Sequence, residues 1–172
     1  KKKIDENKQE YNNTEIVLEN IALGAENKII EFNQFNESSS STIKDINKES
    51  KYYKRKFRLI NFLNNKKTFQ KIKIKISKLK DYIEINNIKK IDFMKIDTEG
   101  YEFEILLGLE NKIKLVDIIM FEHHYDNMIK KGYTFEDINK LLIKNNFNQI
   151  YKSRMPFRKT FEYIYKREEL IN

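Results

Sequence analysis

The sequence predicts a single α/β domain built around a parallel sheet. Two nearly continuous apolar runs, Ile91–Ile96 and Leu115–Phe121, are typical of strands covered on both faces. Between them, residues 100–109 repeat apolar side chains at helical spacing. Together these segments predict a strand, a crossover helix and a second, parallel strand. The length of 172 residues fits one domain, so we expect 1–172 to be one unit.

The first part of the chain predicts further strands. Glu15–Ile21 and Ile29–Phe35 are expected to form an antiparallel pair, with Gly24 and Asn27 in the turn between them. In Thr68–Ile76, isoleucine alternates with lysine, which is the period of a half-exposed strand.

Two more helices and a hairpin complete the expected elements. Ser77 is a suitable N-cap for a short helix. Thr134 opens a later helix, with Asp137 three residues on in a capping-box pattern. Phe147–Tyr151 and Thr160–Tyr165 predict a terminal antiparallel pair.

Composition excludes several functional classes. The chain has no cysteine, which rules out disulfides, thiol nucleophiles and cysteine-ligated zinc, and which fits a reducing, cytoplasmic location. Its four glycines are isolated, so the glycine-rich phosphate loops and the serine-hydrolase elbow are missing. No apolar run approaches the length needed for a transmembrane segment.

The net charge of +8 leaves an alternative function open. Lysine, asparagine and isoleucine, which have AT-rich codons, are enriched throughout, so base composition accounts for much of the charge. Nucleic acid is therefore not the expected partner. However, Lys51–Arg58 interleaves bases with aromatic residues, and Lys71, Lys73 and Lys75 share one strand face. These features keep open a non-catalytic module that binds RNA or an anionic glycan.

Acidic residues and both histidines follow the two central strands. Asp97 and Glu99 come after the first strand, and Glu122, His123 and His124 end the second. Because ligands bind beyond the carboxyl ends of parallel strands, we expect these side chains to converge at one rim. No metal site is predicted, since the spacing fits no known metal motif and adjacent histidines on a strand point to opposite sides. The alternative is a helix cap with ordinary surface histidines.

The segment around the first strand also resembles a known family. Residues 91–108, IDFMKIDTEGYEFEILLG, resemble the central signature of the FkbM family of S-adenosylmethionine-dependent methyltransferases. The resemblance extends over nearly the whole chain through VLENIALG (Val17–Gly24), SSSST (Ser38–Thr42), SKLKDYI (Ser77–Ile83) and IIMFE (Ile118–Glu122).

This resemblance implies a Rossmann-like class I methyltransferase fold, a three-layer sandwich. It also implies S-adenosylmethionine as cofactor and transfer of a methyl group to a hydroxyl of a sugar or other small metabolite, so the expected partner is a small-molecule or glycan acceptor. The residues matched to the site are Asp97 for the cofactor or acceptor, Glu99, Glu122 and His123 for acceptor binding or proton removal, and Asn20, Ile21 and Ala22 for the adenine.

Two departures from the family pattern affect these expectations. Where the family has Leu-Asp-Asp before the signature, this chain has Leu79, Lys80 and Asp81. The family's glycine-containing first strand and the acidic end of its second strand have no match. We therefore expect an N-terminally truncated chain, the C-terminal two-thirds of a catalytic domain without its first strands. A degenerate methyltransferase kept as a scaffold is a further alternative.

Overall fold

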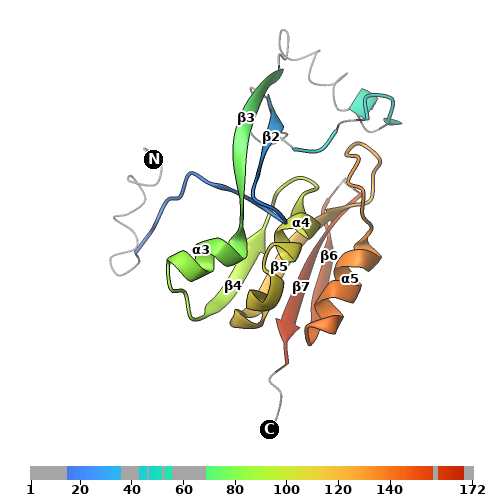
Figure 1. The fold of residues 1–172 in the computed structure, drawn as a ribbon. Coiled ribbons are helices and arrows are strands. Elements are labelled where there is room, and N and C mark those ends of the chain that lie inside the picture. Colours follow the sequence, from blue (N-terminus) through green and yellow to red (C-terminus); the bar gives the residue numbers. More distant parts are fainter. Residues whose placement is uncertain are drawn as a thin grey trace.

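A computed structural model describes residues 15–35, 43–45, 47–51, 53–55, 69–156 and 159–168. They form a mixed α/β fold with two sheets (Figure 1). In chain order the elements are β1 (Ala22–Gly24), β2 (Lys28–Phe35), β3 (Phe69–Lys78), α3 (Leu79–Ile85), β4 (Ile91–Ile96), α4 (Glu102–Leu107), the 3₁₀-helix η3 (Glu110–Leu115), β5 (Val116–His124), α5 (Phe135–Lys144), β6 (Phe147–Arg154) and β7 (Thr160–Arg167). No helix in these ranges is long and apolar enough to cross a membrane.

The predicted strand–helix–strand unit is confirmed. β4 and β5 pair in parallel, from Ile91 opposite Val116 to Ile96 opposite Phe121, and α4 connects them. The sheet continues in the order β4-β5-β7-β6, and its last two strands form the expected antiparallel pair. The mixed sheet thus carries its parallel pair at one edge.

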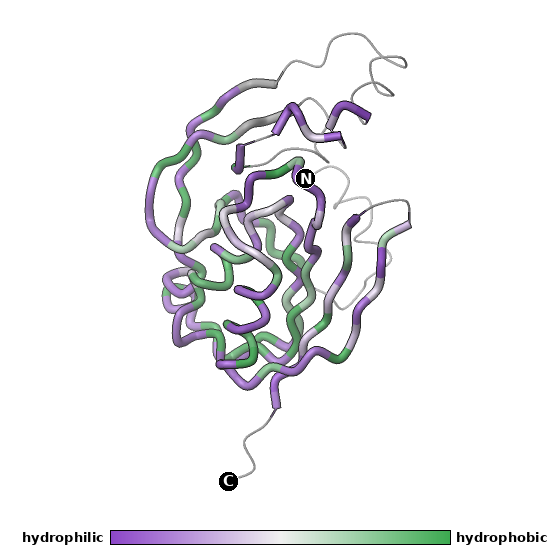
Figure 2. Tube along the Cα trace, turned by 90° about the vertical axis from the view of Figure 1, so that its right-hand side faces the viewer, coloured by the Kyte–Doolittle hydropathy of each residue, from purple (hydrophilic) through white to green (hydrophobic). Residues whose placement is uncertain are grey.

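The helices α4 and α5 pack on one face of this sheet (Figure 1). The hydrophobic parts of the chain gather in this body of the molecule (Figure 2). Helix α5 begins as predicted, because the Thr134 side chain accepts a bond from the Asp137 backbone while the Asp137 carboxylate accepts one from the Thr134 backbone. Its apolar stripe then meets the sheet in a core that includes Ile105, Leu106, Ile119, Phe121, Ile138, Leu142, Tyr163 and Tyr165.

The first sheet differs from its prediction. Its order is β1-β3-β2, so β1 pairs in parallel with β3, and β2 pairs with β3 rather than with the segment before it. Glu15–Ile21 is not a strand, and the predicted antiparallel pair of Glu15–Ile21 with Ile29–Phe35 is wrong. A strand needs a pairing partner, and the alternating β3 supplies one to both β1 and β2. β2 and β3 project from the body as a long ribbon (Figure 1).

The predicted cap at Ser77 is also wrong. β3 runs through Ser77 to Lys78, because Leu23 and Gly24 of β1 pair with these two residues. Helix α3 therefore starts at Leu79 with no side-chain cap. A tertiary bond replaces the cap, since the Lys80 backbone N–H donates to the carbonyl oxygen of Gly108 at 2.9 Å.

Strand β4 is less covered than its apolar run predicted. Phe93 is 52% exposed and Lys95, two residues on, is exposed as well, so one face of β4 is open to solvent. Within the described ranges β4 pairs only with β5, which makes it an edge strand. Apolar runs predict strands well, but they do not reveal whether a second layer covers each strand.

Candidate active site

The ends of β4 and β5 lie side by side, as predicted. Ile96 pairs with Phe121, so Asp97 and Glu122 follow on adjacent strands. Asp97 is half-exposed, and its carboxylate lies 3.7 Å from the Lys95 amine. The acidic rim expected from the sequence is therefore present.

The two histidines of β5 point to opposite faces of the sheet, also as predicted. By strand alternation, His123 shares a face with Phe121, toward α5, and its ring lies 5.9 Å from that of Phe135. His124 shares the other face with Glu122. We call these the helix face and the opposite face.

Glu122 is a buried carboxyl group without a partner. It is 8% exposed, and within the described part of the chain its side chain makes no hydrogen bond or ion pair. Burial raises the pKa of Glu122, and the adjacent Asp97 charge raises it further. Glu162 of β7 pairs directly opposite and adds to the same repulsion. Such a carboxyl group is a stronger base than an exposed one.

His124 joins the acidic residues on the opposite face. Its Nε2 lies 3.3 Å from Oε2 of Glu99, and its Nδ1 lies 3.0 Å from Oγ1 of Thr160 and 3.8 Å from Oδ2 of Asp126. Burial opposes the charged imidazolium, but the contacts with Asp126 and Glu99 outweigh it and raise the pKa of His124. The His124 ring therefore lies against the Glu99 carboxyl group at the rim.

The sequence interpretation included His124 in the expected cluster but gave it no role at the site, although a signal was available. His124 and Glu122 are two residues apart on one strand, and that spacing places them on the same face. The predicted candidate His123 is not brought together with Glu99 or Glu122.

The environment of His123 keeps its ring neutral. It is buried beside Tyr125, Tyr133 and Phe135, and Nζ of Lys131 lies 3.2 Å from its Nε2. Burial, followed by the charge of Lys131, lowers the pKa of His123 to about 3. Burial also lowers the pKa of Lys131.

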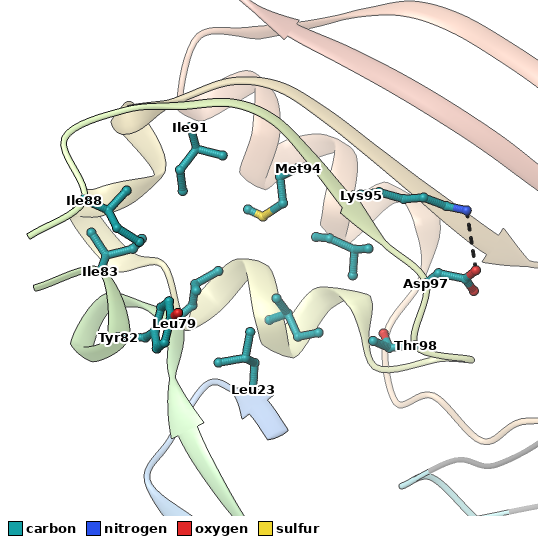
Figure 3. A pocket seen from close by; sticks show the side chains of 12 residues that line it. Leu23, Leu79, Tyr82, Ile83, Ile88, Ile91, Met94, Lys95, Asp97 and Thr98 are labelled. Atoms are coloured by element: carbon teal, nitrogen blue, oxygen red, sulfur yellow. Dashed lines mark ion pairs between the residues drawn. The ribbon is translucent and has the colours of Figure 1, made fainter. Parts of the chain in front are cut away.

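A groove of about 550 Å³ runs along the outer side of β4 and reaches the rim at Asp97 and Thr98 (Figure 3). Its walls come from β1, α3, β4 and α4, and most of the lining is apolar. The lining residues are Leu23, Leu79, Tyr82, Ile83, Ile88, Ile91, Met94, Lys95, Ile96, Asp97, Thr98 and Ile105. Asp97 therefore belongs both to the groove and to the acidic rim.

The three residues matched to the adenine lie next to this groove in the chain. Asn20 and Ile21 are exposed, and Ala22 is half-buried at the start of β1. Leu23, which follows them, lines the groove. Their own side chains are not among the lining residues.

The basic segments behave largely as a solvated surface. Lys54 pairs with Glu49 at 2.6 Å, and Lys71 pairs with Glu31 at 2.8 Å. Lys73 and Lys75 are exposed on the ribbon. In the segment Lys51–Arg58, Lys51 and Arg55 are also exposed, whereas Lys56 and Arg58 lie outside the described residues, as does the serine loop Ser38–Thr42.

Comparison with known proteins identifies the family. The family model for the methyltransferase FkbM domain matches residues 2–151, which is most of the chain. No curated protein and no solved structure matches. The matched range includes β4, α4, β5 and the acidic rim between them. The chain therefore belongs to the FkbM methyltransferase family.

Proposed function

We propose that this protein is an S-adenosylmethionine-dependent methyltransferase that methylates a hydroxyl group of a sugar or other small metabolite. The observation that carries the proposal is the junction at Asp97, where the apolar groove meets a rim of carboxylates. The proposed architecture is a Rossmann-like three-layer sandwich, in which β4 and β5 are the central strands.

The groove suits the proposed cofactor. Its volume of about 550 Å³ is in the usual range for cofactor sites, and its apolar walls suit an adenine ring. Asn20, Ile21 and Ala22 would hold the adenine end, and Asp97 would hold the polar end. When bound, S-adenosylmethionine supplies an electrophilic methyl group next to a positively charged sulfonium. A carboxylate at Asp97 stabilises such a cation.

The other rim residues are proposed to act on the acceptor. Glu122 would take the hydroxyl proton, because burial and the neighbouring Asp97 raise its pKa and make it a stronger base than an exposed carboxylate. Glu99, held by His124, would orient the acceptor through hydrogen bonds. A role for His123 in proton removal requires access from the helix face, where Lys131 contacts its ring.

We further propose that residues 1–172 form the C-terminal two-thirds of the catalytic domain and that the protein acts in the cytoplasm. The edge position of β4 supports the first proposal, because its outer edge can accept another strand. The absence of cysteine supports the second.

Asp97→Asn tests the function. Asparagine keeps the size and much of the hydrogen bonding but removes the charge, so turnover should fall by roughly 10²-fold or more while the circular dichroism spectrum is unchanged. Lys73→Ala, on the exposed ribbon, is the control and should leave turnover unchanged. Near-native turnover of folded Asp97→Asn would remove this carboxylate from the mechanism.

A calorimetric titration with S-adenosylmethionine tests the domain proposal separately. Residues 1–172 alone should bind weakly, whereas the complete gene product should bind well. Tight binding by residues 1–172 would overturn the domain proposal and leave the methyltransferase proposal intact. Absence of binding by the complete product would overturn the methyltransferase proposal.

A further inference from the structure

Glu102, in the first turn of α4, is a carboxylate buried among three donors. Its side chain is 1% exposed. Oε1 accepts a hydrogen bond from the Gly100 backbone N–H at 2.8 Å and from the Thr98 hydroxyl at 3.3 Å. Oε2 accepts one from the Tyr133 hydroxyl. An ionised carboxylate is buried at large cost in free energy unless it is hydrogen-bonded. The three donors therefore stabilise the Glu102 side chain in its buried position.

Two of these donors belong to the turn that follows β4. Glu99 has a φ of +49° and Gly100 a φ of +94°, so two successive residues adopt the left-handed region. For a residue other than glycine this conformation is unfavourable, and it persists only when surrounding contacts impose it. The Glu102 carboxylate supplies such contacts on both sides of Glu99.

The third donor comes from the segment after β5. Burial, together with the charge of Glu102, raises the pKa of Tyr133 well above its usual value, so its hydroxyl stays a donor. The same segment packs directly on the turn, because a Cβ on Gly100 would lie 2.7 Å from Cγ2 of Ile129. Glu102 therefore ties the turn after β4 to the segment after β5.

The turn determines where Glu99 points. Its carboxylate reaches the ring of His124 at 3.3 Å, across the rim from the groove. The charged and titratable groups around His124 come from several elements. They are Glu99 and Glu102 from the turn and α4, Glu122 and, on the other face, His123 from β5, and Asp126 and Lys131 from the segment after β5.

We propose that Glu102 and Tyr133 are positioning residues, which hold the turn at residues 98–100 so that Glu99 stays in contact with His124. Neither side chain is among those that line the groove, and they act through Glu99. The consequence for catalysis rests on the proposed function, but the positioning itself does not.

The test is the pKa of His124, measured by NMR from the imidazole C–H signals during a pH titration. The chain has only two histidines, so His123→Gln assigns both signals. Glu99→Gln removes the neighbouring charge and should lower the pKa of His124 by about one pH unit. Tyr133→Phe keeps the ring but loosens the turn, and it should lower this pKa by at least roughly half as much.

The double variant Glu99→Gln/Tyr133→Phe separates positioning from direct electrostatics. If Tyr133 acts through Glu99, the double variant should match Glu99→Gln alone. The matched control is Tyr125→Phe, whose hydroxyl bonds Tyr163 instead of Glu102, and it should leave the His124 pKa unchanged.

Two results would overturn the proposal. The first is a His124 pKa in Tyr133→Phe that equals the native value. The second is that Tyr133→Phe lowers the His124 pKa as much in the Glu99→Gln variant as in the native protein. If Tyr133→Phe fails to fold, Thr98→Val removes another donor to Glu102 and carries the same expectations. These titrations need no cofactor. A failure to bind S-adenosylmethionine would thus overturn the proposed function while leaving the positioning result standing.

Discussion

The helix face and the opposite face of the four-stranded sheet differ most at the end of β5. On the helix face, His123 is enclosed by aromatic rings and a lysine. On the opposite face, its neighbour His124 lies among carboxylates. Both imidazoles are buried, yet the pKa of His123 falls to about 3 whereas that of His124 is raised.

This difference shows that burial alone does not set the charge of a side chain. Burial disfavours the imidazolium at both positions, but the neighbouring charges have opposite signs. One strand end thus supplies a packed aromatic layer on one face and a cluster of carboxylates on the other.

The largest difference between the faces should appear in stability. Phe121 on the helix face is fully buried and stacks on Tyr163 and Tyr165, so Phe121→Ala should lower the free energy of unfolding by about 3–5 kcal/mol. Phe93 on the opposite face is half-exposed, and Phe93→Ala should cost less than about 1 kcal/mol. Urea unfolding measures both. Equal costs would show that the opposite face is covered at β4.

The next effect is the acid sensitivity that His123 imposes. The unfolded chain binds a proton at His123 near pH 6.5, whereas the folded protein resists it down to about pH 3. Its contribution to stability is therefore lost as the pH falls through this window, at about 1.4 kcal/mol per pH unit. His123→Gln, which can still accept from Lys131, should flatten the fall in unfolding free energy between about pH 4 and 6.

His124→Gln is the matched comparison for this titration. Because the folded pKa of His124 is raised, its contribution is present below about pH 6.5 and is lost as the pH rises through the folded value. This variant should therefore lose stability relative to the native protein on acidification toward pH 6.5. Identical pH profiles for the two variants would contradict the distinction between the faces.

The smallest effect should come from Glu122, and its sign is informative. The raised pKa of Glu122 means that its ionised form destabilises the fold once the pH exceeds the ordinary value of 4.5. Glu122→Gln should therefore raise the unfolding free energy at neutral pH by roughly 1 kcal/mol. The same change should lower the turnover of methyl transfer, because it removes the base proposed to take the hydroxyl proton. A variant that is less stable and fully active would show that Glu122 is a structural residue.

Local patterns predicted many of the elements. The alternation of isoleucine and lysine predicted β3, and the spacing of Thr134 and Asp137 predicted the start of α5. The errors arose where a distant partner decided the outcome. Ser77 lost its capping role to the pairing of β3 with β1, and Glu15–Ile21 pairs with none of the strands in the described ranges.

For the candidate site, too, local patterns predicted some features, and distant contacts decided the others. The sequence by itself determined that acidic residues and histidines end two adjacent parallel strands, and that His123 and His124 point apart, because strand alternation is local. Only the tertiary structure decided which histidine meets the carboxylates, since this depends on which face α5 covers. It also decided the contact of Tyr133 with Glu102, residues 31 apart in the chain. Such contacts follow from how the elements pack, and no local pattern encodes them.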